Sequence, residues 1–242
     1  MSTLKSNVIE PATGTNLSLG AAGDLIDVTS DTLQLNTWKD SGGNTLFVSD
    51  GSGTLSSVNT GLARGGGPNL ISTHTASGSA SLSITSGIDS TYDKYMFVLL
   101  DVNPATDDES LGFQVSTNGG ASYGENITST FFDAYHNEAD NVTGLGYEAA
   151  HSLNQSTAIQ HITNCGGNGA DESGSGILYL FTPASTTYVK HFYARIQGYY
   201  AGSYAQDLYP AGYINTTSAI NAIQFSMTSG NFDATIKMYG CK

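Results

Sequence analysis

A series of short alternating segments, recurring from residue 79 to residue 240 with no credible long helix between them, constrains this chain most. Each segment carries β-branched or aromatic residues at alternate positions and is bounded by turn-forming residues. Only 137–141 and 147–153 are candidates for short helices. The pattern predicts an all-β fold, a two-sheet β-sandwich of jelly-roll type. The predicted strands are 79–84, 94–102, 110–117, 129–136, 157–163, 175–181, 188–200, 206–214, 219–228 and 234–240.

Residues 1–68 differ from residues 69–242, and the two parts are predicted to be separate domains. The first part is rich in Gly, Ser, Thr and Asn and ends in the linker "GLARGGGPN". Two of its stretches, 15–28 and 44–58, share a pattern of alternating apolar residues around a Gly-containing turn, and 31–43 also alternates. Such a segment has too few large side chains to fold alone, so it is either disordered or an intertwined β-shaft completed by neighbouring copies. The alternation favours the shaft.

Two local patterns predict finer detail within residues 69–242. The segment "YVKHFYARI" (188–196) places Phe192, Ala194 and Ile196 on the core face and Tyr193 and Arg195 on the exposed face. The pair Asn118-Gly119 favours the positive backbone angles of a tight hairpin, which is expected to follow the strand at 110–117.

Charge excludes several classes of partner. Asp and Glu number 21 against 8 Lys and Arg, which gives a formal net charge of −13. Nucleic acid and anionic lipid require clustered basic residues, so neither is an expected partner. No apolar run of 18 residues exists, so no transmembrane helix is expected. The stretch "MSTLKSNVIEPATG" has no apolar core, so no secretory signal is expected there.

Acidic residues gather where basic ones are missing. Between Lys94 and Lys190 there is no lysine or arginine, while Asp107, Asp108 and Glu109 form a cluster in a predicted loop. Hard cations such as Ca²⁺ prefer several loop carboxylates, so these three are candidates for a structural Ca²⁺ site or a cation-bridged glycan site. The alternative is an acidic, solvated rim. No other cofactor is expected.

Motifs of catalysis are missing from the sequence. It has no HExxH, GxSxG, Walker-type or dinucleotide-binding pattern. Many carboxylates lie in predicted loops, and spacing selects no pair of them for glycan hydrolysis. We therefore predict that the protein is not an enzyme. The cysteines Cys165 and Cys241 are either two free thiols or a disulfide that closes a long loop.

Tyrosines give the strongest indication of binding. The stretch "YYAGSYAQDLYPAGY" (199–213) contains five tyrosines, whose rings could stack on sugar rings, and neighbouring Asn, Asp and Gln could bond sugar hydroxyls. The candidate glycan or receptor contacts are Tyr199, Tyr200, Tyr204 and Tyr209. Tyrosine is also a routine strand residue whose ring is half-buried, and this alternative stays open.

The sequence also resembles a known group of proteins. The stretches "MSTLKSNVIEPATGTNLSLG" and "GGNTLFVSDGSGTLSSVN" resemble the N-terminal region of tail-fibre-like structural proteins of marine bacteriophages, many of which begin with a similar "STLK…IEPATGT" pattern. Residues 89–107, 113–124, 173–192 and 213–240 resemble a domain frequent in virion proteins of such phages, including proteins of different roles.

The resemblance implies a virion surface protein, a homotrimer with a β-shaft and a globular tip. Its partners would be its own copies, other virion proteins and a host cell-surface glycan or protein. The main hypothesis is a short tail fibre that mediates host attachment through residues 69–242. Alternatives are a capsid decoration, head-fibre or adaptor protein without receptor contact, and a polysaccharide depolymerase. The resemblance carries over no catalytic residue.

Overall fold

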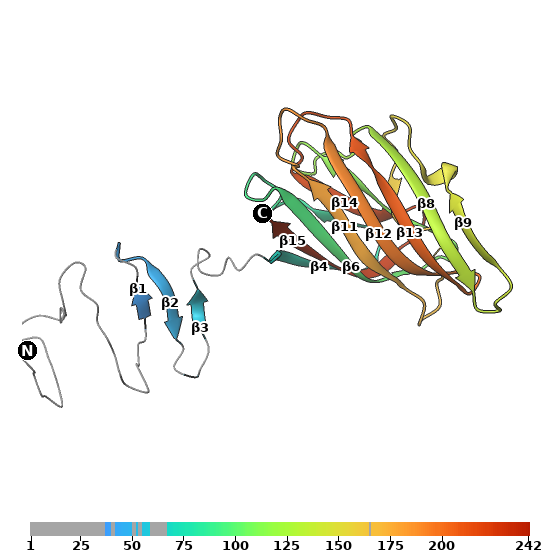
Figure 1. Cartoon of the computed structure of the whole chain (residues 1–242), viewed down its shortest axis with the longest axis horizontal. Helices are drawn as coiled ribbons and strands as arrows, with labels where there is room; N and C mark the ends of the chain where they lie inside the picture. The colour runs from blue at the N-terminus through green and yellow to red at the C-terminus, as the bar shows by residue number, and fades with distance from the viewer. Residues whose placement is uncertain (1–36, 40–41, 50–51, 53–54, 59–66, 165) are drawn as a thin grey trace, which may run out of the picture. The chain divides into compact units, whose positions relative to one another are not determined.

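The computed structural model describes residues 37–39, 42–49, 52, 55–58, 67–164 and 166–242. The chain forms two compact units, Met1–Gly65 and Gly66–Lys242 (Figure 1). Their boundary lies within the glycine-rich stretch where the sequence predicts a linker.

The first unit contains a three-stranded antiparallel sheet. Its order is β1 (Thr37–Lys39), β2 (Thr45–Ser49) and β3 (Leu55–Val58). The Trp38 ring stacks on Phe47 with centroids 5.8 Å apart. The alternating segments found within 44–58 form two paired antiparallel strands, whereas 15–28 lies outside the described residues. The intertwined shaft remains a prediction.

The second unit is built from two antiparallel sheets and confirms the all-β sandwich (Figure 1). Among the described residues, the only helical element is a single 3₁₀ turn, η1 (Ala149–His151). The larger sheet has the order β4 (Asn69–Ser79), β15 (Phe232–Cys241), β6 (Lys94–Pro104), β11 (Gly174–Phe181), β12 (Lys190–Tyr200), β13 (Tyr204–Ile214), β8 (Ile127–Asn137) and β9 (Thr143–Tyr147). The smaller sheet has the order β10 (Gln160–His161), β7 (Leu111–Ser116), β14 (Ala222–Met227) and β5 (Ser81–Ile84).

Successive strands often change sheet. The chain passes from the larger sheet to the smaller between β4 and β5 and between β6 and β7. It passes from the smaller sheet back to the larger between β14 and β15. Strands β12 and β13 instead form a hairpin that widens the larger sheet, and β8 and β9 form its outermost pair. The larger sheet therefore extends by four strands beyond β11.

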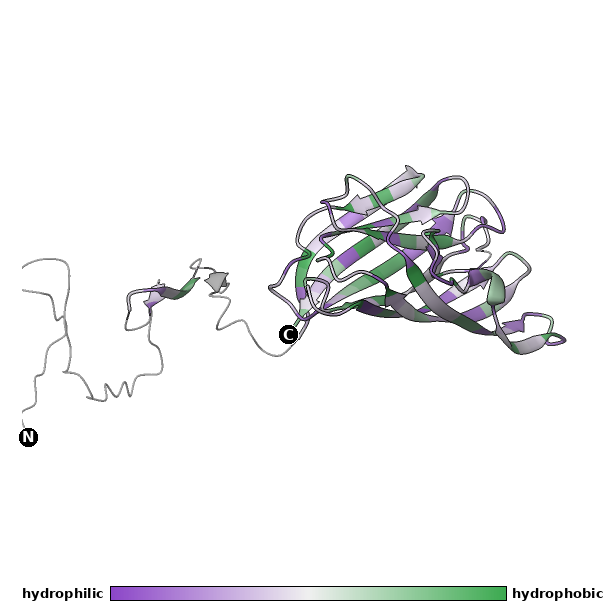
Figure 2. Cartoon of the chain, turned by 90° about the horizontal axis from the view of Figure 1, so that it is seen from above, coloured by the Kyte–Doolittle hydropathy of each residue, from purple (hydrophilic) through white to green (hydrophobic). Residues whose placement is uncertain are grey.

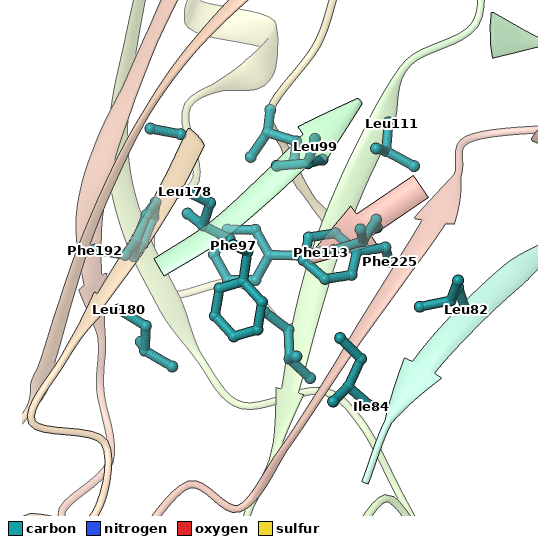
Figure 3. Close-up of a cluster of buried hydrophobic side chains, with 14 of the residues drawn as sticks. Leu82, Ile84, Phe97, Leu99, Leu111, Phe113, Leu178, Leu180, Phe192 and Phe225 are labelled. Atoms are coloured by element: carbon teal, nitrogen blue, oxygen red, sulfur yellow. The ribbon is translucent and has the colours of Figure 1, made fainter. Parts of the chain in front are cut away.

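The core lies between the two sheets (Figure 3). Phe97 on β6 meets Phe225 on β14 edge-on at 5.8 Å, and Phe113 on β7 meets Phe192 on β12 at 5.0 Å. Each contact joins one sheet to the other. Hydrophobic and hydrophilic residues alternate along the strands (Figure 2), because successive side chains point to opposite faces of a sheet.

The predicted faces of 188–196 are confirmed for the residues that were assigned. Phe192, Ala194 and Ile196 are buried, whereas Tyr193 is 46% exposed. Lys190 shares the core face and is fully buried. Its Nζ donates hydrogen bonds to the carbonyl oxygens of Thr216 (3.0 Å) and Ser218 (2.7 Å), and these carbonyls compensate its lost hydration.

Two local predictions are wrong. Gly119 does adopt a positive φ of 73°, but no hairpin forms there, because β7 lies in the smaller sheet and β8 in the larger. The helix expected at 137–141 is a turn instead. The Asn137 side-chain Oδ1 accepts hydrogen bonds from the backbone N–H groups of Asn141 (3.1 Å) and Val142 (2.9 Å) and thereby closes this turn.

Candidate functional site

The outer face of the larger sheet, which points away from the core, carries an aromatic surface. Tyr179 on β11 lies opposite Tyr193 on β12, with ring centroids 5.0 Å apart. Phe181 contacts Tyr193 at 5.5 Å. On the neighbouring pair of strands, Phe132 on β8 lies opposite Tyr209 on β13, and their rings stack at 4.8 Å with an interplanar angle of 6°. Two groups of rings thus stand on four adjacent strands.

These rings remain accessible. Tyr193 is 46% exposed and Phe132 is 41% exposed, although aromatic side chains of this size are often buried. Exposed aromatic side chains that gather on one face are typical of binding surfaces. The rings therefore offer flat apolar platforms to a ligand.

A charged pair lies between the two groups of rings. The Arg195 Nε donates to Asp207 Oδ1 at 3.0 Å, and its Nη2 donates to Oδ2 at 2.7 Å. The Tyr209 hydroxyl also donates to Asp207 Oδ2, and the guanidinium lies over the Tyr209 ring, 5.4 Å from its centroid. The hydrogen bond from Arg195 lowers the pKa of Asp207 below its usual value. This bidentate pair holds both side chains in fixed positions.

A groove of about 730 Å³ runs across this surface. Its lining comes from β11, β12, β13 and β8, and extends from Tyr179 on β11 to His136 on β8. The short side chains of Ala134, Ser175 and Ala205 line it and leave room between the larger ones. The groove therefore forms where small side chains lie beside large ones on the same face of the sheet.

Several polar atoms along the groove have no protein partner within the described part of the chain. They are the hydroxyls of Tyr179 and Tyr193, Nη1 of Arg195 and Oε1 of Gln197. All four side chains line the groove. A ligand with hydroxyl groups could therefore pair with donors and acceptors here while its apolar faces lie on the rings.

The four tyrosines predicted from the sequence do not lie together. Tyr209 stands beside the groove, on the face described above. Tyr200 and Tyr204 close the β12–β13 hairpin with their rings 5.3 Å apart, and Tyr204 also contacts Tyr135. By strand alternation these two share the face of the buried residues. Tyr199 is half-buried near the end of β12, opposite the groove-lining Ala205, and by strand alternation it is on the outer face.

The residues of the predicted acidic cluster form hydrogen bonds to different parts of the same chain. Asp107 Oδ1 accepts a hydrogen bond from the backbone N–H of Asn168 (3.3 Å), and Glu109 Oε2 accepts one from the Thr228 hydroxyl. The backbone of Asp108 donates to the Gly166 carbonyl at 3.1 Å. Among the described residues, no three His, Cys, Asp or Glu side chains group as a metal site. The calcium hypothesis thus gains no support from this part of the chain.

A second polar cluster lies on the inner face near β9. Asp133 is only 2% exposed, and its Oδ1 has no hydrogen-bond partner. A Cβ on Gly146 would lie 3.6 Å from Asp133 Oδ1 and 3.8 Å from Glu148 Oε1, so both carboxylates adjoin this glycine. Burial raises the pKa of Asp133, and the nearby Glu148 charge raises it further. The burial of Asp133 leaves this pair little access to a polymeric substrate.

Two half-buried histidines, His151 and His161, lie next to this cluster, and His151 Nδ1 is 3.8 Å from Glu148 Oε2. The rings of His151 and His161 lie 4.6 Å apart, and the Nδ1 atom of each has no hydrogen-bond partner. Burial lowers the pKa of both, and lowers that of His161 to about 4. We therefore expect both rings to be neutral at pH 7.

The cysteines add no site to the described residues. Cys241, on β15, is a half-buried free thiol. Cys165 lies outside the described residues, but because Cys241 is free, the alternative of a disulfide between the two cysteines is not supported.

Sequence reasoning missed most of the groove. It predicted that Tyr193 and Arg195 are exposed, but it did not connect them with Tyr179, Gln197 or Asp207. The alternation within each strand identifies the outward side chains. This alternation does not specify which strands are neighbours in the sheet, and the groove forms only because β11, β12, β13 and β8 are adjacent.

No family model, curated protein or solved structure matches the chain. In the part of the chain that the structure describes, no helix is long and apolar enough to span a membrane.

Proposed function

We propose that this protein is a non-enzymatic bacteriophage virion protein of the short tail-fibre type, which attaches to a host cell-surface glycan through the groove on the outer face of the larger sheet. The first unit would anchor the protein to other virion proteins and join it into a homotrimer. The resemblance of residues 2–15 to tail-fibre-like proteins supports the virion setting. The exposed Trp38 and its partner Phe47, on so small a sheet, are consistent with packing against further copies.

One observation carries the binding proposal. Aromatic platforms and unpartnered hydrogen-bonding atoms converge in a single open groove. Sugars present both apolar ring faces and hydroxyl groups, and this arrangement complements both. The net charge of −13 fits such a ligand better than a polyanion such as nucleic acid.

The strand order also supports the finer assignment of the fold as a jelly roll. Strands β4, β15, β6 and β11 form one four-stranded block, and β5, β14, β7 and β10 form the other. Chain-consecutive strands divide between these blocks, as expected for two interlocked Greek keys. In this assignment the β12–β13 and β8–β9 hairpins are additions to one sheet, and three of their four strands carry most of the groove.

A carbohydrate microarray probed with the full-length protein tests the proposal. We expect binding to at least one glycan class, and at least a tenfold loss of affinity in the Tyr193→Ala variant, because a stacking platform is removed. Tyr188→Ala is the matched control, since Tyr188 is 72% exposed and does not line the groove. Equal loss in both variants, or no glycan bound, would contradict the proposal.

The same glycans distinguish the depolymerase alternative. A bound polysaccharide incubated with the protein should keep its length, because the adjacent carboxylates Asp133 and Glu148 lie on the inner face, away from the groove. Release of new reducing ends that is abolished by Asp133→Asn would overturn the non-enzymatic assignment.

A further inference from the structure

We infer that the groove binds an internal segment of an uncharged polysaccharide, several sugars long. This inference rests on the proposed function and specifies the class of glycan. It draws on three separate features: the charges that line the groove, its length, and the absence of walls at its ends among the described residues.

The basic groups of the groove are already paired. Arg195 is held by both carboxylate oxygens of Asp207, and Nε2 of His136 lies 2.9 Å from Asp140 Oδ1. Lys94 lies over the Tyr179 ring at 5.3 Å but does not line the groove. A uronic acid or sulfated sugar entering the groove would therefore meet no unpaired cation among its described lining residues and would face the carboxylate of Asp207. Such like charges disfavour binding.

The groups that remain available suit a neutral ligand. The unpartnered atoms are two tyrosine hydroxyls, one amide oxygen and the Nη1 donors of Arg195, whose charge Asp207 offsets. Hydrogen bonds from these groups to hydroxyls need no opposite charge on the ligand. The rings of Tyr179 and Tyr193 add apolar contact area.

The groove is longer than one sugar. Its lining spans four adjacent strands, and three strand spacings amount to about 14 Å. This length exceeds a single pyranose ring. A monosaccharide would therefore occupy only part of the available contacts.

No loop of the described chain closes the groove. Each residue that lines it belongs to β8, β11, β12 or β13, and the lining residues Tyr193, Arg195 and Gln197 are exposed. A site that selects a chain end requires a wall to stop the chain, and the described residues provide none here. A polysaccharide can therefore continue beyond both ends of the groove.

Matched oligosaccharide series test the inference with the full-length protein. We would measure binding of gluco-, manno- and galacto-oligosaccharides of one to eight units, together with their uronate counterparts, which differ by a carboxylate on each ring. We expect one neutral series to bind, with at least a tenfold gain in affinity between one and four units. Its uronate counterpart should bind at least tenfold more weakly, and Tyr193→Ala should abolish the preference.

A charge variant gives a second readout. Asp207→Asn releases Arg195 from its partner, so we expect binding of the uronate series to increase several-fold. Glu138→Gln is the matched control, because it makes the same change of charge at an exposed loop position that does not line the groove. An equal increase in both variants would show a general charge effect and would contradict the role of the pair.

The outcomes separate the inference from the proposed function. Preferential binding of a uronate, if lost in Tyr193→Ala, would overturn the neutral class and leave glycan binding at the groove intact. Equal affinity for monomers and longer chains would overturn the internal-segment inference. Failure to bind glycans of either series or of the microarray would overturn the proposed function as well.

Discussion

Neighbouring residues on β12 have opposite roles because the strand alternates. Phe192 points into the core and meets Phe113, whereas Tyr193 points outward and joins the ring cluster of Tyr179 and Phe181. The sequence predicts both orientations, since the apolar positions 192, 194 and 196 recur with a period of two. At this scale, a core contact and a proposed binding contact belong to adjacent side chains.

Stability measurements can separate these two roles. Phe192→Ala should lower the free energy of unfolding by about 3–5 kcal/mol, because it leaves a cavity between the sheets. Tyr193→Ala should lower it by about 1 kcal/mol or less, because Tyr193 lies on the outer face and is 46% exposed. Urea unfolding of both variants measures the difference, and equal losses would contradict the assignment of faces.

The half-buried histidines predict a dependence of stability on pH. In the folded state burial lowers the pKa of His161 to about 4, whereas an unfolded histidine titrates near its ordinary value of about 6.5. The unfolded state therefore binds more protons between these values, so the stabilising effect of the neutral ring is lost as the pH falls from about 6.5 to about 4. His151 acts in the same direction.

A variant isolates this effect from that of the carboxylates. The pKa of Asp133 is raised in the folded state, so its contribution to stability decreases as the pH rises and opposes that of the histidines. In urea unfolding at pH 7, 6, 5 and 4, His161→Gln should lose less stability than the wild type over the acidic range. Parallel curves for the two proteins would refute this role of the histidines.

At the scale of elements, the sequence predicted strands wherever apolar residues alternate. It missed β4 and β9. In β4 only Ala76 is buried, so pairing with β15 rather than an apolar pattern makes this segment a strand. In β9, "TGLGY", glycines alternate with exposed residues, so no apolar pattern marks the strand. Its hydrogen-bonded pairing with β8 makes this segment a strand.

The groove depends on relations between strands that are distant in sequence. Asp207 on β13 lies opposite Ala134 on β8 and opposite Gln197 on β12. Composition and periodicity do not specify this register. The candidate tyrosines in 199–213 were therefore chosen by proximity in sequence, and two of them, Tyr200 and Tyr204, lie on the opposite face of the sheet from the groove.

Two glycines of the larger sheet should respond differently to alanine. A Cβ on Gly176 would lie 2.3 Å from the backbone oxygen of Arg195, so Gly176→Ala must displace β11 from β12. We expect a loss of about 1–3 kcal/mol in stability and weaker glycan binding, because Gly176 also lines the groove.

The control for this experiment is Gly198→Ala. A Cβ on Gly198 would meet no atom within 4 Å, so this change should be neutral or slightly stabilising. Thermal unfolding of both variants provides the measurement. An equal and large loss of stability in both would contradict the close approach of β11 and β12 at Gly176.

At the scale of the whole molecule, the two units are expected to divide assembly from binding. Residues 66–242 contain the sandwich core, so this part should fold without the first unit. We predict that the truncated protein is a folded monomer and that the full chain is a trimer. Light scattering coupled to size-exclusion chromatography measures both masses, and a trimeric truncated protein would place the assembly interface in the sandwich.

The central claim is that glycan binds on the outer face of the larger sheet. Once the truncated protein is shown to fold, its ¹⁵N-labelled form can be titrated with the neutral oligosaccharide that the full-length protein binds best, and amide shifts can be followed by NMR. We expect the largest shifts on the groove residues of β11, β12, β13 and β8, with Tyr193 and Gln197 among them. Shifts confined to the smaller sheet, or to the Tyr200–Tyr204 hairpin end, would contradict this claim.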